Sequence, residues 1–198
     1  MSRVVAALSM SIDGFVAHDD DSVGHLFDWY ENGDVEVRWP GMGMVSHVSA
    51  PSAAYLRRVI DEVGAIVVGR RVYDYTSGWG GDHPLHVPLY LVTHHAPESW
   101  PRDDAPFTAV TEGVAAAIGA ARVRASEKAV VLAGPNIIQQ AINLDLVDEL
   151  SVDLIPLLLG SGVPFFGELT REDVILDDPE VIEGDRVTHL RYRLRRST

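Results

Sequence analysis

The chain has 198 residues, of which 46% are hydrophobic and 23% charged, and it contains no cysteine. This composition excludes a disordered chain, a disulfide scaffold and every site that needs thiolates. Sixteen Lys and Arg against 29 Asp and Glu give a formal net charge of −13, which disfavours nucleic-acid and membrane partners. No apolar run reaches the length of a membrane span, so we expect a soluble cytoplasmic protein with a small-molecule substrate.

Short apolar runs alternate with helical patterns along most of the chain. The runs cover residues 3–9, 65–69, 89–93, 107–110 and 129–134. Most of them are continuously apolar, as expected for parallel strands covered by helices on both faces. Hydrophobic spacing predicts helices at 52–63, with Ser52 as N-cap, and at 70–76, 113–124 and 135–144.

The pattern changes near residue 148. Residues 148–156 form one more predicted strand, and residues 187–195 alternate, which is typical of a half-exposed antiparallel strand. We therefore predict one domain over residues 1–198, of class α/β, with three layers (α-β-α) and a mixed, mainly parallel sheet that ends in antiparallel C-terminal strands. Residues 14–51 lack periodicity and are predicted to form a long loop that serves as a lid or a binding segment.

Glycine or small polar residues end three of the predicted strands, and a helix or turn follows at once. The segments are Gly69-Arg70-Arg71, Thr93-His94 and Ala133-Gly134-Pro135-Asn136. The carboxyl ends of parallel strands line the ligand crevice, where helix N-termini present free N–H groups to anions. Glycine permits close approach to a phosphate, and arginine supplies a fork of donors. Together these segments predict a site for a phosphorylated dinucleotide.

Four segments resemble the dihydrofolate-reductase-like superfamily. They read AALSMSIDGFVA (6–17), AIVVGRRVYD (65–74), VLAGPNIIQQAI (131–142) and VDELSVDLIPLLLGSGVPFF (147–166). The last is similar to the reductase domain of bacterial riboflavin-biosynthesis proteins (the RibD C-terminal domain) and to its stand-alone relatives. This resemblance implies a dihydrofolate reductase-like fold and a homodimer. It also implies NADPH-dependent hydride transfer to a small heterocycle of the 5-amino-6-(5-phosphoribosylamino)uracil type.

The resemblance also implies roles for particular residues. Arg70 and Arg71 would hold the 2′-phosphate of NADPH, Gly69 would approach its pyrophosphate, and Thr93 and His94 would form a second phosphate-side turn. The turn under the nicotinamide and pyrophosphate would be Ala133, Gly134, Pro135, Asn136, Ile137 and Ile138.

The sequence indicates the residues that contact the substrate less specifically than those that bind the cofactor. Dihydrofolate reductases proper carry a carboxylate near the start of the helix predicted at 52–63, whereas this chain has none there, so we do not expect efficient reduction of dihydrofolate. Asp13, in a Ser-Ile-Asp-Gly turn, is the candidate catalytic carboxylate, although an Asp-Gly turn needs no function. Trp29 is a candidate to stack on the substrate or to pin the loop, and Tyr55 offers a hydroxyl.

Other functions remain open at this stage. Eight histidines invite a metal site, but their spacing fits no helical ligand pair, so we expect none. The alternatives to an NADPH-dependent reductase are a reductase that uses a flavin or deazaflavin, and a non-catalytic nucleotide-binding module of the same fold.

Overall fold

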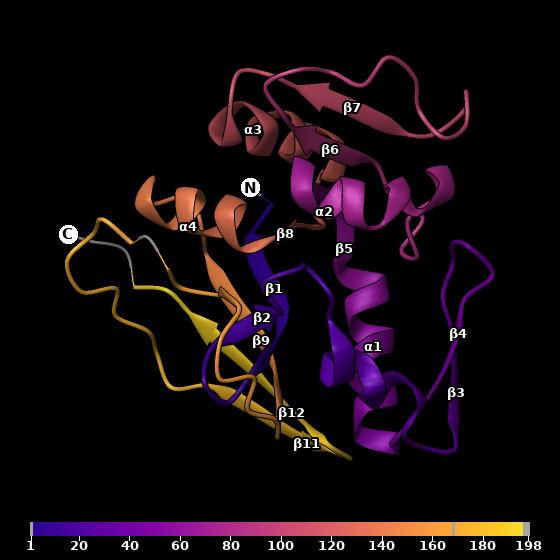
Figure 1. Cartoon of the computed structure of the whole chain (residues 1–198), viewed down its shortest axis with the longest axis vertical. Coiled ribbons are helices and arrows are strands. Elements are labelled where there is room, and N and C mark those ends of the chain that lie inside the picture. Colours follow the sequence, from indigo (N-terminus) through magenta and orange to yellow (C-terminus); the bar gives the residue numbers. More distant parts are fainter. Residues whose placement is uncertain (1, 168, 196–198) are drawn as a thin grey trace.

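The computed structural model describes residues 2–167 and 169–195 and is built on one eight-stranded sheet (Figure 1). The strands lie in the order β11-β12-β9-β1-β8-β5-β6-β7. Their bounds are β1 (Val4–Ser11), β5 (Val63–Gly69), β6 (Leu89–Val92), β7 (Phe107–Val110), β8 (Ala129–Ala133), β9 (Glu149–Ile155), β11 (Glu180–Gly184) and β12 (Val187–Arg193). The strands from β9 to β7 pair in parallel, whereas β12 pairs antiparallel with β9 and β11 antiparallel with β12. The predicted mixed, mainly parallel sheet is confirmed.

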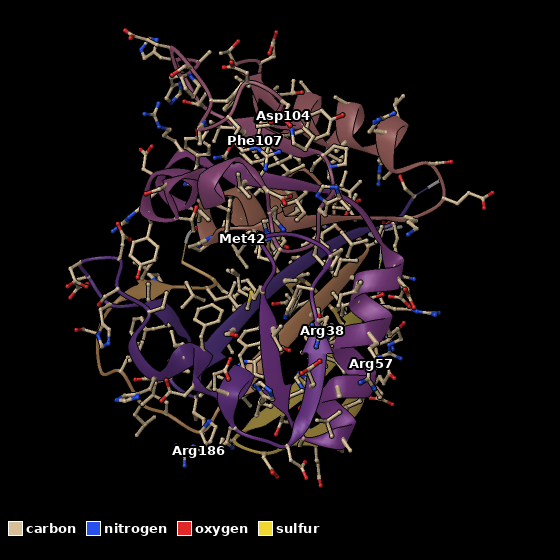
Figure 2. The ribbon with its side chains drawn as sticks, turned by 90° about the vertical axis from the view of Figure 1, so that its right-hand side faces the viewer. Arg38, Met42, Arg57, Asp104, Phe107 and Arg186 are labelled. Carbon is tan, nitrogen blue, oxygen red and sulfur yellow. The ribbon has the colours of Figure 1, made fainter. Side chains whose placement is uncertain are left out.

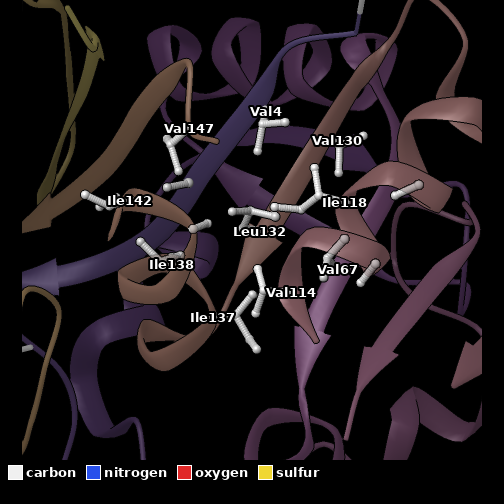
Figure 3. Packing of buried hydrophobic residues seen from close by; sticks show 14 of the residues in the cluster. Val4, Val67, Val114, Ile118, Val130, Leu132, Ile137, Ile138, Ile142 and Val147 are labelled. Carbon is white, nitrogen blue, oxygen red and sulfur yellow. The ribbon is translucent and has the colours of Figure 1, made fainter. Parts of the chain in front are cut away.

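Helices cover both faces of this sheet. They are α1 (Ala50–Glu62), α2 (Arg70–Tyr75), α3 (Val114–Ala125) and α4 (Pro135–Asn143). Ile118 of α3 and Ile138 of α4 pack with Leu132 on one face (Figure 3). On the other face, Leu56 of α1 packs with Ile155 of β9. The arrangement is therefore the predicted three-layer α-β-α fold, and no helix in the described residues is long and apolar enough to cross a membrane.

The start of α1 differs from the prediction. Ser49 is the N-cap and the helix begins at Ala50, whereas Ser52 lies within the first turns and is only 1% exposed. Pro51 explains the difference, because proline is tolerated in the first turn of a helix, so the helix starts before it. The hydroxyl of Ser52 is therefore turned into the protein.

The long loop predicted over residues 14–51 is wrong, because this segment contains regular secondary structure. It contains β2 (Phe15–Ala17), which pairs with β10 (Val163–Pro164), the 3₁₀ helix η1 (Gly24–Glu31), and the hairpin of β3 (Val35–Arg38) and β4 (Val45–Val48). Figure 2 shows the hairpin alongside α1, where Arg57 donates to the carbonyl of Glu36 over 3.0 Å. Elements this short carry too few residues for a periodic pattern, although they bury Leu26, Trp29, Val37 and Val48.

The last strand is covered on both faces. Leu190 and Tyr192 pack on the side of α3 and α4, as their alternation predicted. The prediction of a solvent-exposed opposite face is wrong, because Val187 is 3% exposed and His189 is fully buried. The reason is that Val187 packs into the core formed by α1, η1 and the β3–β4 hairpin. A fully buried histidine thereby faces α1.

Candidate functional site

Two of the predicted cofactor turns lie side by side at the carboxyl ends of two central strands. β5 ends at Gly69 and β8 ends at Ala133, and these strands are parallel neighbours. Gly134 has φ +109°, and a Cβ on it would lie 3.0 Å from Cγ2 of Val72. A Cβ on Gly69 would likewise lie 3.0 Å from Cγ1 of Ile137. The glycines therefore allow the starts of α2 and α4 to approach each other closely.

The start of α4 offers backbone groups rather than side chains. Pro135 occupies its first turn, and Ile137 and Ile138 are buried in the core. The exposed side chain of Asn136 accepts a hydrogen bond from Nε2 of Gln140 over 2.7 Å. Because the first N–H groups of a helix have no partner within it, this end of α4 suits an anion.

Both arginines that are predicted to bind phosphate are exposed, and each forms an ion pair with a carboxylate. Nε of Arg70 donates to Asp74 over 2.8 Å, and Nε of Arg71 donates to Asp21 over 2.6 Å. Nη1 of Arg70 also reaches the carbonyl of His95 at 3.5 Å. Exposed ion pairs of this kind contribute little stability, so a phosphate can replace the carboxylates.

The turn after β6 lies beside Arg70. Thr93 is buried, and its hydroxyl donates to the carbonyl of His95 over 2.9 Å, whereas His94 is exposed. Since Arg70 reaches the same carbonyl, this turn and the start of α2 form one continuous surface.

Asp13 anchors a loop. Its exposed carboxylate accepts hydrogen bonds from the Ser11 hydroxyl over 2.6 Å, from the N–H of Gly160 over 2.7 Å and from that of Leu159 over 3.2 Å. The Ser11 hydroxyl, followed by the Gly160 N–H, lowers the pKa of Asp13 below its usual value. A carboxylate that is stabilised in its charged form is a poor proton donor. The catalytic role of Asp13 stays a prediction, and these contacts argue against it.

The two predicted substrate residues lie together inside the protein. Trp29 is 2% exposed, stacks on Tyr30 with ring centroids 4.0 Å apart and meets His189 edge-on at 5.1 Å. Tyr55 is 5% exposed and stacks on His189 at 4.0 Å. Trp29 therefore packs η1 against the sheet, and neither ring is presented to solvent.

No pattern in the sequence groups these rings with Asp153 and His189. Nδ1 of His189 lies 2.7 Å from Oδ1 of Asp153, and Nε2 lies 2.9 Å from Oγ of Ser52. The hydroxyl of Tyr55 lies 3.0 Å from Oγ of Ser151. We call Ser52, Tyr55, Ser151, Asp153 and His189 the inner polar cluster. An aspartate within the apolar strand at 149–155 was the one available signal.

Burial shapes the acidity of the hydroxyls around this cluster. It raises the pKa of Tyr55 well above its usual value, and the Asp153 carboxylate raises it further. The pKa of Tyr30 is raised by the same two causes. Both phenols therefore stay protonated and act as neutral hydrogen-bonding groups.

Ser52, His189 and Asp153 match a hydrolytic triad in composition but not in access. Ser52 is 1% exposed within α1, and His189 is fully buried. A nucleophilic serine has to reach a substrate carbonyl, which this hydroxyl cannot do. The cluster is therefore a buried hydrogen-bond chain rather than a nucleophile and its base.

A small cavity adjoins the cluster. It measures about 180 Å³, and its walls are His25, Asp28, Trp29, Ile155, Leu157 and Arg186. Trp29 links the two, since it also contacts His189. In the described part of the chain, no group of three or more His, Asp or Glu side chains is placed to hold a metal ion.

The three-layer fold, which carries glycine-containing turns at its strand ends here, is also found in known structures. Dihydrofolate reductase from Enterococcus faecalis, in complex with NADP(H), aligns with a TM-score of 0.57 and 12% identity over 98% of this chain and 97% of that one. The fold is therefore dihydrofolate reductase-like, as predicted.

The family follows from the sequence match. The model of the RibD C-terminal domain matches residues 2–188, so the chain belongs to that family. A protein of Shewanella sp. PV-4, assigned provisionally to riboflavin biosynthesis, has a TM-score of 0.74 and 22% identity over 98% of this chain and 99% of its own. A diaminohydroxyphosphoribosylaminopyrimidine deaminase/5-amino-6-(5-phosphoribosylamino)uracil reductase of Thermotoga maritima has a TM-score of 0.61 and 10% identity over 98% of this chain and 57% of its own.

Proposed function

We propose that this chain is an NADPH-dependent reductase that transfers a hydride to a small heterocycle of the ribosylamino-pyrimidine type. One observation carries the proposal. The Gly69-Arg70-Arg71 turn and the Gly134-Pro135 turn lie next to each other at the carboxyl ends of β5 and β8. Membership of the RibD C-terminal domain family supports it. We take residues 1–198 as one such domain in the cytoplasm.

The residues present fit NADPH. Two glycines keep the space between α2 and α4 free of Cβ atoms, which leaves backbone N–H groups available for the pyrophosphate. Arg70 and Arg71 would hold the 2′-phosphate by exchanging their present carboxylate partners for it. NADPH supplies the hydride when bound, and the protein positions it and excludes water.

The two alternative functions make different demands on the site. A flavin or deazaflavin cofactor carries no 2′-phosphate, so it would not need an arginine pair placed for that group. A non-catalytic module would bind NADPH without consuming it. The arginine pair beside the glycine turns favours NADPH over a flavin, and only a turnover measurement separates a reductase from a non-catalytic module.

The substrate class draws on the Thermotoga protein, whose described activity is reduction of a ribosylamino-uracil. Our sequence-based expectation against dihydrofolate rested on the lack of a carboxylate at the start of α1. Asp153 lies in β9 and is held by His189, and the expectation that dihydrofolate is not reduced efficiently stays a prediction. Both compounds therefore belong in the substrate assay.

The test is a fluorescence titration of the protein with NADPH, NADH and flavins, followed by NADPH oxidation with each substrate at 340 nm. We expect NADPH to bind more tightly than the other carriers and the ribosylamino-uracil to be reduced. NADPH binding without oxidation by any pyrimidine or pterin would instead identify a nucleotide-binding module.

A homodimer through the C-terminal strands is the expected assembly. β11 is at the edge of the sheet, and Val181 on it is 51% exposed, while Leu158 and Phe166 are 69% and 41% exposed. Pairing of two edge strands about a two-fold axis would cover such surface. We expect light scattering at micromolar concentration to give twice the chain mass, and Val181→Glu to give the monomer. A monomeric wild-type protein would contradict this prediction.

A further inference from the structure

The cavity beside Trp29 has walls from three places in the fold. They are the 3₁₀ helix η1, the end of β9 with Ile155 and Leu157, and the turn between β11 and β12 with Arg186. Figure 2 shows Arg186 at the lower edge of the molecule. The cavity volume of about 180 Å³ exceeds the roughly 150 Å³ of an apolar cavity that takes up benzene. One six-membered ring with a small substituent therefore fits.

The inner walls of the cavity are apolar and rigid. Trp29 is 2% exposed and Ile155 is 3% exposed, while Leu157 is half-buried. Tyr30 stacks on the indole of Trp29 with ring centroids 4.0 Å apart, and Nε1 of the indole donates to the Ser9 hydroxyl over 3.4 Å. An indole that is held on one side and already hydrogen-bonded offers a ligand apolar contact alone. The body of the ligand is therefore apolar.

The outer walls carry charge, and one charge lacks a partner. Oδ2 of Asp28 lies 2.6 Å from Nδ1 of His25, so this carboxylate is already engaged. Arg186 is exposed, and among residues 2–167 and 169–195 its guanidinium has no hydrogen-bond or ion-pair partner. A guanidinium binds a carboxylate through two parallel hydrogen bonds. The wall at Arg186 is therefore suited to an anionic group.

The backbone does not explain an arginine at this position. Gly184 pairs with Val187, so Asp185 and Arg186 form the turn between β11 and β12. Arg186 has φ +57°, a left-handed conformation that strains a side chain but that glycine adopts freely. Glycine would therefore suit the turn better, and the arginine side chain points to a role outside the turn itself.

The cavity is separate from the turns assigned to the cofactor. Those turns follow β5 and β8, whereas the cavity adjoins the end of β9 and the turn before β12. β1 lies between β9 and β8 in the sheet. A ligand in the cavity would therefore leave the cofactor turns free.

We propose that this cavity is a binding site for a small organic carboxylate whose apolar body is a single ring. The ring packs against Trp29, Ile155 and Leu157, and the carboxylate pairs with Arg186. Inorganic phosphate fits poorly because three of the walls are apolar, and a long acyl chain exceeds the volume of the cavity. This inference goes beyond the proposed reductase function and does not depend on it.

The direct test is calorimetry with benzoate as the probe and Arg186→Gly as the variant. We expect the wild type to bind benzoate with a Kd of about 1 mM or tighter, and the variant to bind it about tenfold more weakly or worse. Glycine relieves the positive φ, so the variant should unfold at no lower urea concentration than the wild type. Arg38→Ala removes an exposed arginine paired with Glu36 and should leave benzoate binding unchanged.

Three further probes separate the parts of the ligand. Acetate lacks the ring and benzyl alcohol lacks the charge, so each should bind about tenfold more weakly than benzoate. Benzylamine carries the opposite charge and should bind more weakly still. Tighter binding of benzylamine than of benzoate would overturn the proposal, because the Asp28 carboxylate would then select the ligand.

The arginines at the cofactor turns provide a control for the location of the anion. The double variant Arg70→Ala/Arg71→Ala should bind benzoate as the wild type does, because both side chains lie outside the cavity. Loss of benzoate binding in this variant would place the anion at the cofactor turns and overturn the proposal. So would equal affinity of the wild type and Arg186→Gly, or failure of the wild type to bind benzoate.

Nuclear magnetic resonance locates the ring without a change at Arg186. The indole N–H signal of Trp29 should move when benzoate is added. That of Trp100, which packs on Tyr73 and Phe107 near the opposite edge of the sheet, should not. An unmoved Trp29 signal at saturating benzoate would also overturn the proposal.

Discussion

Replacing Arg70 and Arg71 together by alanine should weaken NADPH binding by about ten- to a hundredfold and leave NADH binding nearly unchanged. The expected loss is that of charge-assisted hydrogen bonds to the 2′-phosphate, which NADH lacks. Both side chains are exposed beside the glycine turns, so neither supports the core. Protein fluorescence titrations with the two nucleotides provide the affinity ratio.

Two controls sharpen this experiment. Asp21→Asn removes the carboxylate that Arg71 now holds, so NADPH should bind the variant severalfold more tightly. Arg57→Ala removes an exposed arginine on α1, whose partner is the carbonyl of Glu36, and should change neither affinity. An unchanged NADPH/NADH ratio in the double variant would show that the phosphate lies elsewhere.

Trp29→Ala should lower the free energy of unfolding by about 3–5 kcal/mol, the usual cost of removing a buried large aromatic side chain. The indole is 2% exposed, and its removal leaves a hole between Tyr30 and the edge of His189. It also enlarges the adjoining cavity of about 180 Å³. Urea unfolding, followed by far-ultraviolet circular dichroism, measures the change.

The matched control is Phe27→Ala in the same 3₁₀ helix. Phe27 is 38% exposed, so we expect less than about 1 kcal/mol from its removal. If Trp29→Ala instead unfolds at the wild-type urea concentration and only substrate binding suffers, Trp29 stacks on the substrate and does not pin η1.

The sequence by itself determined the layered sheet and the family resemblance. Continuous apolar runs identified the parallel strands, and 3.6-residue spacing located all four α-helices within a few residues. Glycines at the ends of 65–69 and 129–134 marked the turns that meet in the structure. These features are local, since each depends on neighbours along the chain, and local patterns survive without knowledge of the fold.

Only the tertiary structure decided which side chains meet. Ser52 and His189 are 137 residues apart, and His189 and Asp153 are 36 apart, yet they form one hydrogen-bond chain. The register of β12 against β9, and the cover that α1 provides, create that contact. The folding of residues 14–51 also arose from packing, since its short elements gain stability only against the sheet and α1. Long-range pairing leaves no periodic trace in the sequence, and for that reason the buried histidine and the carboxylate beside it were invisible before the strands were assembled.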